Sequence, residues 1–180
     1  MLGSCDSPNP VLYTLSVIPG RAQPGGPAVV NIHEISVARY LERPQIVRSA
    51  ADNRLDVMAN EWWGEPWSAM LGRVLEEELS QRLPGSIVFG ENGAISSAAD
   101  ATVEINLERM DAAGPQSVAL IAQTAVNFAN NKDHPVLRKI RIEAPTPTPD
   151  TAGLVAAMSA AVGQLADRLA DMLRSGRSGG

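Results

Sequence analysis

Few residues of this 180-residue sequence have the types and spacing that covalent, acid–base or metal chemistry requires. There is one cysteine, Cys5, and two histidines, His33 and His134, neither with a local metal-ligating partner. The carboxylate run 76–78 falls within a predicted helix and indicates a solvated helix face. No nucleophile elbow, phosphate-binding loop or zinc-protease motif occurs. The sequence therefore predicts a protein that is not an enzyme and has no bound metal and no cofactor.

Cys5 has a setting of its own. It closes the sequence Leu2-Gly3-Ser4-Cys5, which is the pattern of a bacterial lipobox, where the cysteine becomes the acylated first residue after signal cleavage. The charged and apolar regions of a signal peptide do not precede it, so we expect them upstream of Met1. The motif alone is equally compatible with an ordinary thiol at a frayed terminus or a vector-derived Gly-Ser pair.

Composition narrows the class of protein further. Apolar residues make up 44% of the chain and charged residues 19%, which suits one folded domain with its own core. No apolar run approaches the roughly 18 residues of a membrane-spanning helix. The formal charge of −5, without clustered lysine and arginine, argues against nucleic acid as a partner. One cysteine excludes an intrachain disulfide framework.

Tryptophan is concentrated in one segment. Trp62, Trp63 and Trp67 are three of the seven aromatic residues and fall within six positions. Trp67 begins the apolar stripe of a predicted helix and is expected in the core. Trp62 and Trp63 are adjacent and cannot face the same way, so we expect at least one to be exposed or to contact a partner.

The elements that must position these residues follow from hydrophobic periodicity. Strands are predicted at 11–18, 29–37, 87–89, 101–108, 117–128 and 137–143, with a hairpin at 45–48 and 54–58. The strands from 87–89 onward are expected to form a meander, and the turn residues at 114–115 and 130–133 predict that its last three strands pair antiparallel as neighbours. The apolar phase slips between Ile32 and Ile35, which indicates a bulge or burial on both faces. Amphipathic helices are predicted at 66–83 and after a cap at Asp150 or Thr151.

These elements predict an α+β fold, an antiparallel or mixed sheet of about six strands with both helices packed on one face. We expect a lipobox remnant and tether at 1–10, a single domain at 11–174 and a flexible tail at 175–180.

Three segments together resemble one family. Residues 40–47, YLERPQIV, resemble the YLDRPQIV stretch of the PqiC family, the ABC-type transport auxiliary lipoproteins, formerly a domain of unknown function. Residues 63–67, WGEPW, resemble their WAEPL motif, and residues 12–15, LYTL, match the strand that follows the lipidated cysteine. The similarity runs from Val11 to about Leu173. Glu42 and Trp67 depart from the family pattern, which has Asp and Leu there.

The resemblance implies a fold similar to the N-terminal domain of TolB and a non-enzymatic lipoprotein of the periplasm, acylated at Cys5. It also implies that the protein works beside an MCE-domain protein, which conducts lipid between the membranes, and beside the associated permease and ATPase. A further implication is that the protein itself forms an oligomeric ring. Family members are expected mostly at the outer membrane, whereas Asp6 is the residue that favours inner-membrane retention in enteric bacteria.

The loop Arg43-Pro44-Gln45 is rigid, polar and charged, which suits docking to a protein surface. We expect a partner-binding surface formed by Tyr40, Arg43, Gln45, Trp62 and Trp63. In the alternative interpretation Arg43 pairs with Glu65 or another carboxylate and only fixes the fold.

A second hypothesis for the function is a soluble periplasmic carrier that binds a lipid or amphiphile between sheet and helices. An enclosed apolar pocket would be the structural sign of such a carrier.

Overall fold

The computed structural model describes residues 9–49, 53–91, 97–131 and 134–176. In chain order they form β1 (Val11–Tyr13), β2 (Val29–Val37), the 3-10 helix η1 (Arg39–Leu41), β3 (Gln45–Ser49), β4 (Leu55–Trp63), α1 (Trp67–Arg82), β5 (Ile87–Gly90), β6 (Ala101–Ala112), β7 (Ser117–Phe128), β8 (Val136–Pro145) and α2 (Thr151–Ser175). Cys5 and residues 177–180 lie outside the described residues. The prediction of a tail from 175 onward was wrong at its start, because Ser175 is the last residue of α2.

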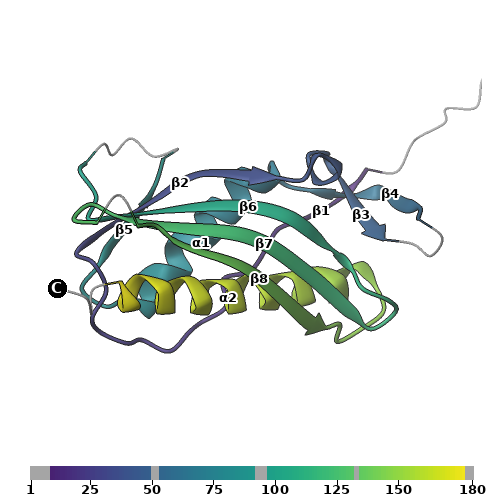
Figure 1. The fold of residues 1–180 in the computed structure, drawn as a ribbon. Coiled ribbons are helices and arrows are strands. Elements are labelled where there is room, and N and C mark those ends of the chain that lie inside the picture. The colour runs from purple at the N-terminus through teal and green to yellow at the C-terminus, as the bar shows by residue number, and fades with distance from the viewer. Residues whose placement is uncertain (1–8, 50–52, 92–96, 132–133, 177–180) are drawn as a thin grey trace, which may run out of the picture.

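The strands form two sheets. A five-stranded sheet has the order β5-β2-β6-β7-β8, and a three-stranded sheet has the order β1-β4-β3. The smaller sheet lies at one end of the molecule and the last turns of α2 at the other (Figure 1). The predicted α+β fold is confirmed, with the strands divided between two sheets.

Local turn chemistry explains the antiparallel part of the larger sheet. β6, β7 and β8 pair as consecutive antiparallel neighbours, as the sequence predicts. Gly114 turns the chain between β6 and β7 with a φ of 101°, a conformation that favours glycine. β5 differs from expectation, because it pairs parallel with β2 instead of continuing a meander.

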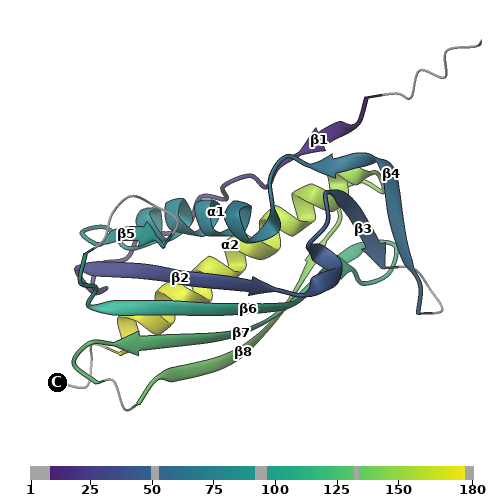
Figure 2. The ribbon, with the colours of Figure 1, turned by 90° about the horizontal axis from the view of Figure 1, so that it is seen from above.

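Both helices cover one face of the five-stranded sheet (Figure 2). Their apolar stripes meet the inward side chains of the strands, and Trp67 is 2% exposed, as predicted. The Asp150 side chain caps α2 by accepting a hydrogen bond from the Gly153 amide at 2.9 Å. No helix among the described residues is both long and apolar enough to span a membrane.

The phase slip predicted in β2 is a true irregularity. The register of β2 against β6 shifts between Ile32 and Ile35. An extra residue in a strand reverses the sides to which the following backbone groups point. The second half of β2 therefore directs its hydrogen-bonding groups differently from the first half.

The prediction for the carboxylate run was wrong at Glu78. This side chain is fully buried, and its Oε1 accepts a hydrogen bond from the Ile18 amide at 2.7 Å. Arg82, one turn later and 2% exposed, donates to the carbonyls of Ile18 and Gly163 and to the Asp167 carboxylate at 2.7–3.2 Å. The helix periodicity places residue 78 beside the apolar stripe of α1. The backbone of a segment that includes Ile18 lies against the helix at this point and supplies the amide donor.

That segment is the part of the predicted first strand that forms no sheet. The strand ends at Tyr13, and residues 14–18, here called the strap, run across the two helices. The Leu15 amide donates to Met70 Sδ at 3.3 Å, and the Ser16 amide donates to Ser159 Oγ at 3.1 Å. Side chains of α1 and α2 thus take the place of a neighbouring strand.

Candidate functional site

The two sequence motifs that stood apart in the chain meet in one cavity of about 510 Å³. Its walls are the turn at 42–44, the β4–α1 junction at 63–68 and Val37 at the end of β2. We call this cavity the Trp groove. The Trp63 amide donates to the Pro44 carbonyl at 2.6 Å, which joins the two walls directly.

The floor of the Trp groove is aromatic. The rings of Trp63 and Trp67 meet edge to face, with centroids 4.9 Å apart and planes at 69°. Both are almost fully buried, at 6% and 2% exposure. The indole Nε1 of Trp67 is buried without a hydrogen-bond partner in the described part of the chain. The floor is therefore an aromatic surface whose polar content includes this indole N–H.

The rim of the groove is charged and Arg43 is its unpaired cation. Glu65 pairs with Arg73 at 2.5 Å, and Arg73 also donates to Thr14 Oγ1 at 3.2 Å. The interpretation in which Arg43 pairs with Glu65 is therefore wrong. Arg43 is exposed and forms no ion pair with any described residue. An exposed, unpaired guanidinium beside an apolar floor suits recognition of a partner.

Tyr40 supports the groove from outside. Its hydroxyl donates to Asp111 Oδ2 at 2.8 Å and accepts from the Met110 amide at 3.0 Å. Burial, the largest cause, raises the pKa of Tyr40 well above its usual range, with the Asp111 carboxylate acting in the same direction. The phenol therefore stays protonated and fixes η1 to β6, which makes Tyr40 a positioning residue for Arg43.

Of the other predicted residues, Trp63 lies in the groove, whereas Gln45 and Trp62 lie beside it. Gln45 and Trp62 face each other in the β3–β4 pair. Trp62 is partly exposed and donates from Nε1 to the Ala59 carbonyl at 3.0 Å. The structure thus brings together Arg43 and Trp63, and their role as partner-binding residues stays a prediction.

The sequence missed Val37 and Ser68 as groove residues. Each belongs to a correctly predicted element, but their meeting depends on the end of β2 lying beside the start of α1. No spacing within the sequence carries that information. His33 lies elsewhere, paired with Glu91 at 2.9 Å. The described residues contain no group of three His, Cys, Asp or Glu side chains that would hold a metal ion.

Comparison with known proteins gives a family match over most of the chain. The family model described as "ABC-type transport auxiliary lipoprotein component" matches residues 13–170. No curated protein sequence matches the chain.

Among solved structures, an uncharacterised protein is 16% identical with a TM-score of 0.76, and the match covers 91% of this chain and 98% of the other. A DUF330 protein from Xanthomonas campestris is 19% identical with a TM-score of 0.76, covering 93% and 97%. The PelC dodecamer from Paraburkholderia phytofirmans is 10% identical with a TM-score of 0.44, covering 89% and 98%. The first two similarities establish the fold.

Proposed function

The chain belongs to the family of ABC-type transport auxiliary lipoproteins, and from that premise we propose that it is a non-catalytic docking subunit of an envelope lipid-transport system. In this proposal its partner is an MCE-domain protein that conducts lipid, together with the associated permease and ATPase. The Trp groove carries the proposal, because the two family-like motifs, at residues 40–47 and 63–67, together form one apolar, charge-rimmed surface there.

The proposal places the protein at the periplasmic face of a membrane, held by acyl chains on Cys5. A single acyl chain gives only marginal membrane binding, whereas several on one cysteine hold stably. The resemblance favours an anchor in the outer membrane, whereas Asp6 favours retention at the inner membrane, so the proposal includes both locations. A homo-oligomeric ring is part of the same proposal and would place several Trp grooves around one conduit.

The composition of the groove supports docking over catalysis. Interface hot spots are enriched in tryptophan and arginine, and here Trp63 and Arg43 line the same cavity. The groove contains carboxylates but no histidine, cysteine or lysine. The residues are suited to binding a protein surface through apolar contact and one directed charge.

The packing of the interior gives no support to the alternative, a carrier with lipid between sheet and helices. Large side chains from both layers fill that space: Leu107 and Leu120 from the sheet and Leu75 and Leu165 from the helices are 0% exposed. A close-packed interior leaves no room for an acyl chain without displacement of these residues. Lipid co-purifying with the delipidated, anchor-free chain would revive the carrier.

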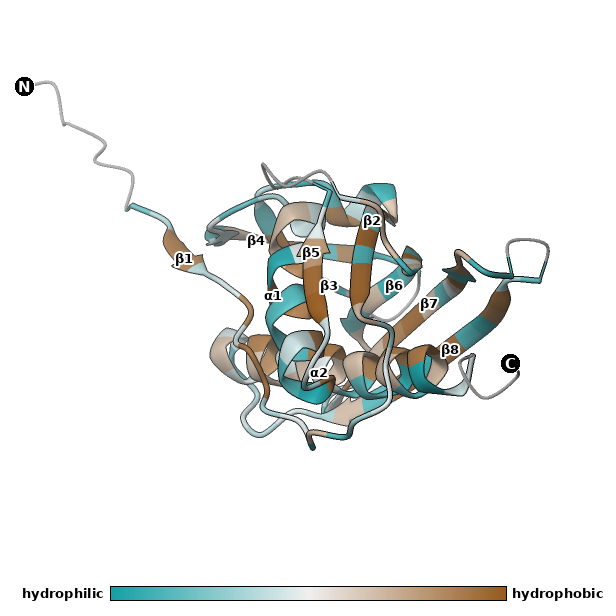
Figure 3. Cartoon of the chain, turned by 90° about the vertical axis from the view of Figure 1, so that its left-hand side faces the viewer, coloured by the Kyte–Doolittle hydropathy of each residue, from teal (hydrophilic) through white to brown (hydrophobic). Residues whose placement is uncertain are grey.

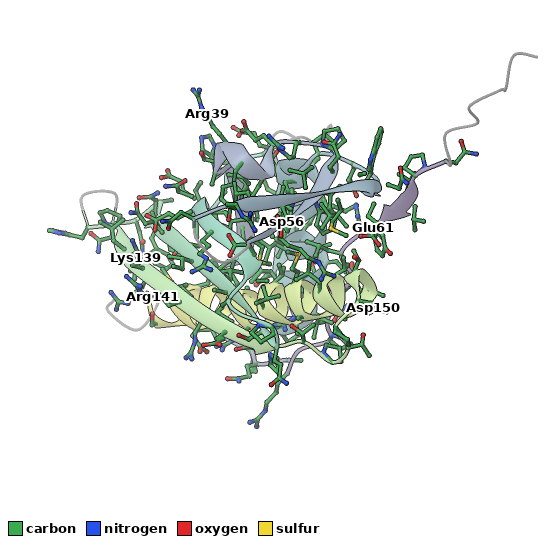
Figure 4. All side chains as sticks on the ribbon, turned by 90° about the vertical axis from the view of Figure 1, so that its right-hand side faces the viewer. Arg39, Asp56, Glu61, Lys139, Arg141 and Asp150 are labelled. Carbon is green, nitrogen blue, oxygen red and sulfur yellow. The ribbon has the colours of Figure 1, made fainter. Side chains whose placement is uncertain are left out.

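The docking proposal is tested by co-purification of the MCE-domain protein of the same organism from native envelopes. We expect Arg43→Ala to weaken the complex roughly tenfold, because a directed charge at an interface is worth about 1.4 kcal/mol or more. Arg39→Ala is the matched control. Arg39 is exposed, has no ion-pair partner among the described residues and projects away from the body (Figure 4).

Equal recovery from both variants would contradict the role of the groove. Anchoring has its own test, which is mass spectrometry of the N-terminal peptide from membranes. An unacylated Cys5 on a protein recovered in the soluble periplasm would contradict it.

A further inference from the structure

β2 has an outer edge that is only half covered. On one side β2 pairs with β6 as far as Val37. On the other side β5, which lies beside β2 in Figure 3, pairs with it only from Val29 to Ile32, because β5 ends at Gly90. Beyond Ile32, the outer edge of β2 has no neighbouring strand among the described residues.

The bulge turns backbone groups toward this uncovered edge. The Glu91 amide donates to the Ile32 carbonyl, so Ile32 faces the β5 side. The Ala38 amide donates to the Leu107 carbonyl, so Ala38 faces β6. Backbone groups alternate along a strand, so Ile35 and Val37 direct their N–H and C=O groups away from β6, to the β5 side. No described residue hydrogen-bonds to them there.

These backbone groups, which no described residue pairs, are not simply exposed to water. Ile35 and Val37 are 7% and 8% exposed. A buried amide or carbonyl without a partner costs about 1–3 kcal/mol, so most proteins satisfy such groups. An edge of this kind stabilises any strand that pairs with it.

There is space for such a strand along α1. A cavity of about 570 Å³ adjoins Ile35, and the Trp groove adjoins Val37. Ser68 lines both cavities, so the two are neighbours along the helix. The α1 wall of the first cavity consists of the small residues Ser68, Ala69 and Gly72, which let another backbone come close. We call the outer edge of β2 and these two cavities the edge slot.

We infer that the edge slot binds an extended segment of the partner protein as an added strand, paired with the backbone of Ile35 and Val37. The inference rests on the proposed docking function and specifies its mode. Strand addition supplies donors and acceptors to an uncovered edge and places alternate side chains in pockets. An acyl chain would fill the cavities but leave the four backbone groups unpaired. A polypeptide is therefore the occupant that fits.

Charge gives the bound segment a direction. Arg43 lies at the Trp-groove end of the slot and Glu76 at the other, and neither forms an ion pair with a described residue. Glu91 adds a second carboxylate at the Glu76 end, next to His33. A complementary segment carries an acidic residue toward Arg43 and a basic residue toward Glu76. From Ile32 to Val37 the edge accommodates about five or six residues, or roughly 17 Å of strand.

Amide hydrogen exchange followed by NMR on the full chain tests the uncovered edge. We expect the amides of Ile35 and Val37 to exchange at least tenfold faster than the amide of Ser36, which points to β6 and is paired. Addition of the purified periplasmic part of the MCE-domain protein should slow exchange at Ile35 and Val37 and leave Ser36 unchanged. Slow exchange at all three positions in the free chain would overturn the inference.

A slot-filling variant provides the second arm. Ser68→Phe places a ring where both cavities meet, and Glu77→Phe places the same ring on the exposed side of α1. With thermal unfolding as the check on folding, we expect Ser68→Phe to reduce affinity for the same MCE fragment at least tenfold and Glu77→Phe to retain it.

The outcomes separate the two proposals. If the wild-type chain and Ser68→Phe bind the fragment equally, the strand-addition inference fails and the docking function stands. If the wild-type chain binds no MCE fragment, the docking function fails and the inference, which names that partner, fails with it. Both proposals are supported if Ser68→Phe loses binding while the wild-type chain and Glu77→Phe retain it, and if the fragment slows amide exchange at Ile35 and Val37 but not at Ser36.

Discussion

At the scale of single residues, Glu78 and Arg82 are the costliest side chains to bury. A buried charge is tolerated only when hydrogen bonds and an opposite charge compensate it. Arg82 meets this condition through three backbone carbonyls, those of Ile18, Glu78 and Gly163, and the Asp167 carboxylate. Glu78 meets it less completely, because its Oε2 has no partner in the described part of the chain. The pair nevertheless holds the strap in place.

Glu78 makes the stability of the protein depend on pH. Burial raises the pKa of Glu78 to about 7 from 4.5, against the opposing effects of the Ile18 amide and Arg82. Between about pH 4.5 and pH 7, Glu78 therefore keeps its proton in the folded state and loses it in the unfolded chain. The resulting stabilisation is complete below about pH 4.5 and is lost as the pH rises through 7.

We expect the wild-type protein to lose about 2–3 kcal/mol more unfolding free energy between pH 5 and pH 8 than Glu78→Gln does. The glutamine keeps an acceptor for the Ile18 amide and has no charge to desolvate. Urea denaturation at the two pH values measures the difference. Parallel pH profiles for the two proteins would contradict the assignment.

At the scale of elements, the strap depends on close approach to α2. A Cβ added at Gly163 would lie 2.8 Å from Ile18 Cβ, closer than two carbons approach without displacement. A Cβ added at Gly72, in α1, would meet only Ile35 Cδ1 at 3.7 Å, an ordinary contact. The two glycines therefore form a matched pair.

Both Gly→Ala changes gain the same intrinsic helix stability, up to about 1 kcal/mol, so the gain cancels between them. We expect Gly163→Ala to be less stable than Gly72→Ala by about 1–3 kcal/mol, the usual cost of overpacking. Chemical denaturation of both variants checks this. A Gly163→Ala protein as stable as Gly72→Ala would show that the strap adjusts freely.

The elements also show which parts of the fold the sequence predicts. The β6–β7–β8 meander, the β3–β4 hairpin, both helices and the bulge in β2 follow from local periodicity and turn residues. The strap does not, because Leu15 and Val17 alternate like strand residues although their partners are helix side chains. The parallel pairing of β5 depends on a neighbour more than 50 residues away. Glu78 was misjudged for the same reason, since Ile18 lies 60 residues from it in the chain.

The candidate site divides in the same way. The motif residues Arg43 and Trp63 were predicted from their types, which stand out locally. Val37 and Ser68 were not, because ordinary residues become part of a groove only through the packing of β2 against α1. The contacts of Tyr40 with Asp111 and Met110 on β6 could not be predicted either, because they join residues about 70 positions apart in the chain.

At the scale of the whole molecule, the small sheet is the end that the tether would join to the membrane under the proposed acylation of Cys5. Only five residues separate Cys5 from Val11, so the tether spans at most about 20 Å. Of the six exposed large apolar side chains in the described ranges, four belong to this sheet: Val11, Leu12, Leu55 and Val57. We expect this end to lie close to the bilayer.

Fluorescence on the acylated protein in lipid vesicles checks this orientation. Leu12→Cys and Leu137→Cys introduce label sites that are equally exposed, at 63% each, and Cys5 is blocked by its acyl chains. We expect an environment-sensitive dye to be quenched by lipid-bound nitroxides at position 12 and not at position 137. Equal quenching would contradict a fixed orientation.

The central claim is that the Trp groove is the surface that meets the transport partner. Photo-cross-linking in living cells tests it most directly, with a photoreactive amino acid at Glu42, on the exposed groove rim, or at Asn106, exposed on β6. The account predicts a cross-link to the MCE-domain protein from position 42 and none from position 106. A cross-link from position 106 with none from position 42 would contradict it.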